Sequence, residues 1–129
     1  MNNNGVLKIT SLLSLLLLTL HVTDDIVRGI SKAESSNTAL VVLVVFLYGT
    51  LVLAERRWGH VIMFLVGLFA AGIPVIHMTG IGLGQGRSTG AFFFIWTLLA
   101  LAVTSIFSVI LAVRGLWSLR SRRAREVSR

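Results

Sequence analysis

The chain contains no cysteine, a single proline and few charged residues. Without cysteine it has no disulfide, no thiolate metal site and no CxxC redox chemistry. Charged residues make up 13% of the 129 residues, whereas soluble domains average about a quarter. Hydrophobic residues make up 55%. Because a surface with so little charge is poorly solvated by water, this composition predicts a protein of the lipid bilayer.

The hydrophobic residues fall into four long segments. A helix that crosses the hydrocarbon core of a bilayer needs about twenty mostly apolar residues. The segments at 6–30, 38–54, 61–77 and 91–117 approach or exceed this length, and polar or glycine-rich stretches separate them. Since backbone groups within lipid must be satisfied internally, the sequence predicts an all-α fold. We expect residues 1–129 to form one domain, an antiparallel four-helix transmembrane bundle.

Basic residues are distributed unevenly around these segments. Nine of the twelve Lys and Arg residues fall on the side where the first segment begins, and only Arg28, Lys32 and Arg87 fall on the other. Cytoplasmic loops carry an excess of Lys and Arg, so both termini are predicted to be cytoplasmic, in a plasma membrane that we take to be bacterial. The residues expected to contact lipid headgroups on this side are Arg56, Arg57, Arg120, Arg122, Arg123 and Arg125.

The basic tail at 118–129 contributes much of the net charge of +7. We expect the tail to bind anionic lipids, because clusters of Lys and Arg beside a span are attracted to them. Nucleic acid is not predicted as a partner, since the chain offers no soluble basic domain to bind it. A protein partner or a second copy of the chain remains an open alternative.

Ionisable residues collect at the outer end of the first segment. His21, Asp24, Asp25 and Arg28 are separated by three, four and seven residues, so they share one face of a helix. Ser14 extends this face toward the membrane centre. Ionisable groups within a membrane are costly and usually face the bundle interior. The spacing therefore predicts an intramembrane cluster that faces the other helices.

Two further segments are predicted to lie at the same level as this cluster. His77 ends the third hydrophobic segment, on the outer side of the membrane. The glycine-rich loop at 79–90 would bring Gln85 and Arg87 over the same side, where it could act as a lid. We therefore interpret His21, Asp24, Asp25 and His77 as candidate site residues, with Arg28, Ser14, Gln85 and Arg87 in supporting positions.

Several kinds of chemistry remain open for this cluster. His21, Asp25 and His77 could bind a divalent transition metal, because two imidazoles and a carboxylate suit zinc or non-haem iron. A proton or cation relay is also possible, since histidine titrates near neutral pH. Haem between His21 and His77 is disfavoured, because the sequence has no attachment motif. The cluster could instead be a structural ion network, with Arg28 paired to Asp24.

The sequence thus predicts a small four-span membrane protein whose outward-side cluster binds a metal ion or relays a proton or cation. Two alternatives remain open: a non-catalytic membrane subunit, and a membrane enzyme acting on lipid or quinone. No familiar functional motif maps onto the chain. Small multidrug-resistance transporters carry a buried glutamate where this chain reads LLSLLLL, and vitamin K epoxide reductase-like proteins need a CxxC that is absent.

Overall fold

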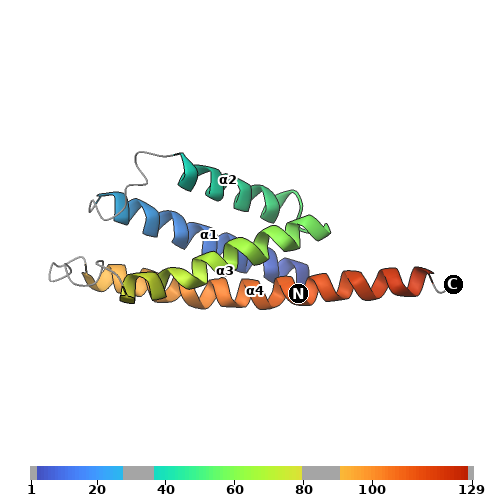
Figure 1. Ribbon diagram of the computed structural model, residues 1–129. Coiled ribbons are helices and arrows are strands. Elements are labelled where there is room, and N and C mark those ends of the chain that lie inside the picture. Colours follow the sequence, from blue (N-terminus) through green and yellow to red (C-terminus); the bar gives the residue numbers. More distant parts are fainter. Residues whose placement is uncertain (1–2, 28–36, 80–90, 128–129) are drawn as a thin grey trace.

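The computed structural model describes residues 3–27, 37–79 and 91–127, which form four helices and no strand. The helices lie side by side in an elongated bundle, and the C-terminal part of α4 extends beyond the other three (Figure 1). The prediction of an all-α fold is confirmed. The helices are α1 (Asn3–Val27), α2 (Thr38–Leu51), α3 (Arg57–Thr79) and α4 (Ala91–Val127).

Three of these helices, α1, α3 and α4, are long and apolar enough to cross a membrane. The second helix differs from the prediction, because it ends at Leu51 rather than at residue 54. Its 14 residues rise only about 21 Å, less than the hydrocarbon core of about 30 Å. The apolar residues after Leu51 form the turn into α3 instead, in which the backbone N–H groups of Val52 and Leu53 both donate to the carbonyl oxygen of Tyr48.

The helices α1 and α4 each bury one narrow stripe of residues, spaced alternately four and three apart. This spacing averages 3.5 residues, the period that keeps one seam facing a neighbouring helix at a shallow crossing angle. The stripe of α1 consists of Leu7, Ser11, Ser14, Leu18, His21 and Asp25, and that of α4 of Phe94, Leu98, Leu101, Ser105, Ser108 and Ala112.

Glycines bring the backbones of α3 and α4 close together. A Cβ atom added at Gly67 would lie 3.1 Å from Cγ2 of Val109 and 3.4 Å from the carbonyl oxygen of Ser105. A Cβ atom added at Gly115 would collide with the imidazole of His60. In a membrane, helices associate through such close packing rather than through the hydrophobic effect. The helices α3 and α4 are therefore closely packed against each other.

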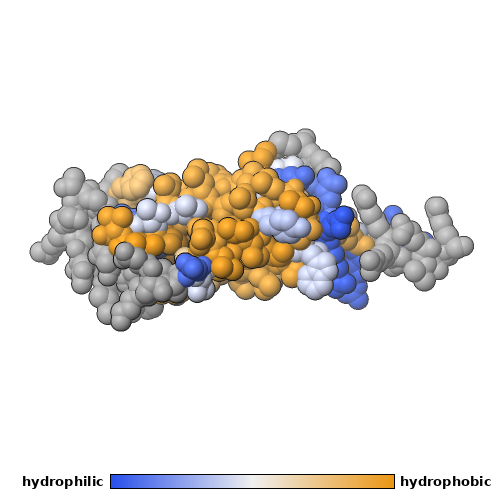
Figure 2. Space-filling view, turned by 90° about the horizontal axis from the view of Figure 1, so that it is seen from above, coloured by the Kyte–Doolittle hydropathy of each residue, from blue (hydrophilic) through white to orange (hydrophobic). Residues whose placement is uncertain are grey.

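The outer surface of the bundle is apolar along its middle. About a third or less of each candidate span is buried within the protein (28% for α1, 33% for α3 and 28% for α4). Figure 2 shows this apolar middle and, beside it, hydrophilic residues at the end where α4 emerges. Trp58 and Trp117 are 71% and 73% exposed, next to the basic residues of α3 and α4. Amphipathic rings at such a boundary are typical of a membrane interface.

Candidate metal centre

The first two residues of the candidate site come from one face of α1. His21 and Asp25 are one helical turn apart, at adjacent positions of the buried stripe, and are only 2% and 8% exposed. Nε2 of His21 lies 3.5 Å from Oδ2 of Asp25. The four-residue spacing therefore presents an imidazole nitrogen and a carboxylate oxygen to the same point inside the bundle.

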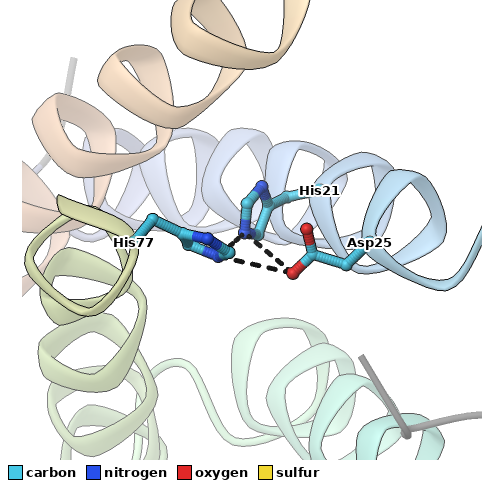
Figure 3. Close-up of side chains that lie close together, drawn as sticks. All are labelled: His21, Asp25 and His77. Carbon is cyan, nitrogen blue, oxygen red and sulfur yellow. Dashed lines mark hydrogen bonds and ion pairs between the residues drawn. The ribbon is translucent and has the colours of Figure 1, made fainter. Parts of the chain in front are cut away.

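The third residue, His77, comes from the C-terminal part of α3 and is 9% exposed. Its Nε2 atom lies 3.0 Å from Nε2 of His21 and 3.4 Å from Oδ2 of Asp25. Figure 3 shows the three side chains pointing toward one another from the two helices. The predicted meeting of His77 with the first helix thus occurs, and we call His21, Asp25 and His77 the His/Asp/His cluster.

The spacing of the three atoms matches the coordination shell of a small metal ion. The two Nε2 atoms and Oδ2 of Asp25 form a triangle with edges of 3.0, 3.4 and 3.5 Å. Ligands held tetrahedrally at about 2.0–2.1 Å from zinc are about 3.3–3.4 Å apart. An ion about 0.7 Å out of the plane of this triangle would lie at that ligand distance from all three atoms. Among the described residues, three potential ligand atoms are thus spaced like three corners of a tetrahedral site.

Each atom of the triangle can offer an electron pair. The carboxylate oxygen only accepts, and a neutral imidazole has one nitrogen without hydrogen. Two imidazole nitrogens only 3.0 Å apart must therefore share a proton or face a cation, because two lone pairs repel. Among the described residues, Nδ1 of His21 and Oδ1 of Asp25 have no hydrogen-bond partner and are buried. The contact between the two imidazoles therefore holds either a shared proton or a cation.

An aromatic ring from α4 closes one side of the cluster. The ring of Phe94, which is 4% exposed, has its centroid 5.3 Å from that of His21 and 5.4 Å from that of His77. Contacts of this kind restrict the rotation of both imidazoles and exclude water from that side. Sequence reasoning did not identify Phe94. Apolar and small residues recur alternately four and three positions apart along the last hydrophobic segment, and Phe94 is one of them. This spacing could have indicated that Phe94 faces the other helices.

A cavity of about 300 Å³ adjoins the cluster between α1, α2 and α3. All three cluster residues line it, and most of the other lining side chains are apolar. The sequence also gave no indication of this cavity, because it depends on how α2 packs against its neighbours. Its apolar wall includes Leu18, Val22, Val42, Leu43, Phe69 and Ile73.

The remaining predicted site residues do not meet in this cluster. Asp24 lies half-buried on α1 and contributes no ligand atom to the group. Ser14 is fully buried two turns away, where its hydroxyl donates to the carbonyl oxygen of Thr10 at 2.9 Å. Arg28, Gln85 and Arg87 lie outside the described residues, as does the predicted lid at 79–90 apart from Thr79, which ends α3.

The predicted headgroup contacts have exposed positions where the structure describes them. Exposed side chains include Arg56, Arg57, Arg120 and Arg125, whereas the side chains of Arg122 and Arg123 lie outside the description. His60, which follows Arg56 and Arg57 in the sequence, is buried instead. It is 1% exposed, and its Nδ1 atom lies 3.0 Å from the carbonyl oxygen of Arg56.

The geometry of the two cluster histidines does not suit haem. Two axial nitrogens lie on opposite sides of a haem iron, about 4 Å apart at ordinary metal–nitrogen distances. The Nε2 atoms of His21 and His77 are 3.0 Å apart, with their rings nearly perpendicular at 89°. A porphyrin plane does not fit between nitrogens this close. A single ion held jointly with Asp25 does.

Comparison with known proteins gives no family for this chain: no protein-family model, curated protein or solved structure matches it.

Proposed function

We propose that the protein is an integral membrane protein that binds one divalent transition-metal ion with His21, Asp25 and His77. The observation that carries this proposal is the triangle of ligand atoms, with edges of 3.0–3.5 Å, contributed by two helices and buried. Three such ligands around an open position are typical of catalytic rather than structural zinc sites, which have four protein ligands. The proposed site is thus open to a further ligand.

The donor set narrows the choice of metal. Two imidazoles and one carboxylate suit zinc, and the same set with open positions is found in non-haem Fe(II) proteins. Magnesium and calcium are disfavoured, because they prefer oxygen ligands. A bound zinc or iron ion would act as a Lewis acid toward the group at its open position.

A proton or cation relay through the membrane is less well supported than a metal site. The buried stripe of α1 continues from the cluster to Leu18, which packs with Ala70, Leu98 and Leu101 in one apolar layer. A second apolar layer around Phe46 and Met63 lies nearer the basic end of the bundle. A relay needs a continuous chain of polar groups or water, and these two layers interrupt it.

The proposed topology follows from the contact between α1 and α3. The cluster joins the C-terminal parts of both helices, so the chain must return between them through the region of α2. We infer an antiparallel arrangement with the cluster on the outer side of a bacterial plasma membrane. The excess of Lys and Arg at the other end supports cytoplasmic termini, and anionic lipids are the proposed partners of the tail.

This topology can be tested with single cysteines, because the chain has none of its own. A cysteine at Asn37 should react with an impermeant maleimide added to intact cells. A cysteine at Glu55 should react only after the membrane is permeabilised. The reverse pattern would place the cluster on the cytoplasmic side and contradict the proposed orientation.

Metal analysis of the purified protein tests the proposed function directly. We expect about one equivalent of zinc or iron in the wild-type protein after loading and removal of free metal. The variants His21→Gln and His77→Gln should lose it, whereas His60→Gln should retain it, because the buried His60 is outside the cluster. Elution position in size-exclusion chromatography and circular dichroism would verify that each variant is folded.

Two outcomes would overturn the proposal. The first is a wild-type protein that carries no stoichiometric metal after loading with zinc, Fe(II) or cobalt. The second is equal metal retention by the His77→Gln and His60→Gln variants, which would place the metal somewhere other than the cluster.

A further inference from the structure

The proposed metal site adjoins a cavity that is lined by both ionisable and apolar side chains. At one end are the cluster residues His21, Asp25 and His77, and the rest of the wall is mostly apolar, formed by residues of α1, α2 and α3. The volume of about 300 Å³ lies at the lower end of the range for small-molecule sites, about 300–1,000 Å³. A cavity with one polar end and an otherwise apolar wall fits an amphiphilic ligand, which has a polar headgroup and an apolar chain.

The charge of the site favours an anionic headgroup. A divalent ion held by Asp25 and two neutral imidazoles retains one positive charge, which is costly to leave unbalanced in a low-dielectric environment. Thr38 and Ala39, the first residues of α2, also line the cavity. The N-terminus of a helix carries a partial positive charge that attracts anions. Two separate features thus favour an oxygen anion at this end of the cavity.

The surroundings of the cavity favour a hydrocarbon chain as the rest of the ligand. The wall includes Val42 and Leu43 of α2 and Phe69 and Ile73 of α3. The helix α2 is too short to cover a full membrane thickness, and most of its side chains face outward. In a bilayer, the molecules that surround such a helix are lipids. An amphiphile could thus reach the cavity from within the membrane.

We propose that the cavity binds the chain of a lipid-like amphiphile whose anionic oxygen headgroup, a carboxylate or a phosphate, occupies the open position of the metal. This inference rests on the proposed metal site and names the class of its ligand. It differs from adventitious contact with the bilayer, because it requires the headgroup and the chain to be held by the same molecule, at the cluster and in the cavity respectively.

The test uses the full-length protein in nanodiscs, loaded with Co²⁺, whose visible spectrum reports its ligands. The probes are acetate, dodecanoate, dodecyl phosphate and dodecanol. Val42→Trp would fill the cavity, whereas Val41→Trp places the same side chain on an exposed position of α2 that does not line the cavity. Comparing the two variants in identical nanodiscs cancels the partition of the probes into lipid.

We expect dodecanoate or dodecyl phosphate to change the Co²⁺ spectrum of the wild-type protein and of Val41→Trp at similar concentrations. Val42→Trp should need an about tenfold higher concentration of the probe, because the hydrocarbon chain of the probe no longer fits the cavity. Acetate should bind all three proteins alike, and dodecanol should leave the spectrum unchanged. Whichever of the carboxylate and the phosphate binds more tightly identifies the headgroup.

Three results would contradict this inference. Equal behaviour of Val42→Trp and Val41→Trp would show that the chain is not held in the cavity. An equal response to dodecanol would show that the anionic charge is not recognised, and no response to either long-chain anion would leave the open position to water. In each case the Co²⁺ spectrum would still show a metal site. Failure to bind Co²⁺ at all would instead refute the proposed function.

Discussion

Replacing Asp25 with asparagine should weaken metal binding at the cluster by at least about 100-fold, since loss of a group that only hydrogen-bonds to a ligand already costs about 10–100-fold. The substitution keeps the shape of the side chain but removes its negative charge. Oδ2 of Asp25 lies 3.5 and 3.4 Å from the two imidazole nitrogens, so it forms one corner of the ligand triangle. A 100-fold loss corresponds to about 2.7 kcal/mol of binding free energy.

Asp24 provides a matched control for this experiment. It is adjacent in sequence and carries the same charge, but it contributes no ligand atom to the cluster. Asp24→Asn should therefore change the affinity only through weaker, longer-range electrostatics, by less than about threefold. Competition with a chromophoric chelator measures both dissociation constants. Equal losses in the two variants would refute the assignment of Asp25 as a ligand, because they would reflect net charge rather than coordination.

Three further predictions concern the ligand shell and the helix packing. X-ray absorption of the zinc-loaded protein should show only nitrogen and oxygen neighbours at about 2.0–2.1 Å, two of them imidazoles; a sulfur shell or more than two imidazoles would contradict the proposed ligands. Gly115→Ala should lower the melting temperature, because the new methyl group meets the buried ring of His60, whereas Gly72→Ala, with nothing within 4 Å, should leave it unchanged or raise it. Lys8→Gln should change the stability by less than about 1 kcal/mol, as measured by chemical denaturation in detergent, since the contact of Lys8 with Glu55 is 3.8 Å long and solvent-exposed.

The sequence predicted the all-α fold and much of the cluster because both follow from local rules. Helical periodicity places His21 and Asp25 on one face of α1, and the rise per residue places His77 at a similar depth. Helical periodicity alone does not tell which of Asp24 and Asp25 belongs to the cluster. The stripe that α1 buries advances by four and then three residues from Leu7 to Asp25. Asp24 lies one residue off this stripe, and hydrophobicity alone does not mark the stripe, because it contains two serines.

Features that depend on packing between helices could not be predicted in the same way. The length of α2 depends on which residues form the turn into α3, and Val52 and Leu53 are apolar enough to have continued the helix. The ring of Phe94 reaches the cluster because α4 packs against both α1 and α3. The cavity beside α2 similarly arises from three helices at once. Sequence periodicity assigns faces to single helices, but it does not fix the rotation of one helix against another.

The metal proposal and the ion-network hypothesis differ in which positive charge lies between the three side chains of the cluster, a metal ion or a proton. If Arg28 pairs with Asp24, as the ion-network hypothesis holds, Asp25 is left with the two imidazoles at 3.5 and 3.4 Å. These three groups then need at least one shared proton, because they otherwise present only electron pairs to one another at the His21–His77 contact of 3.0 Å. A metal ion must take the place of that proton on Nε2. A neutral imidazole then carries its hydrogen on Nδ1 instead, and only an imidazolium releases protons to the buffer. Calorimetry in buffers of different ionisation enthalpy would count them. A binding enthalpy that does not depend on the buffer would mean that both imidazoles are neutral before the metal binds, and it would contradict an imidazolium–carboxylate ion network.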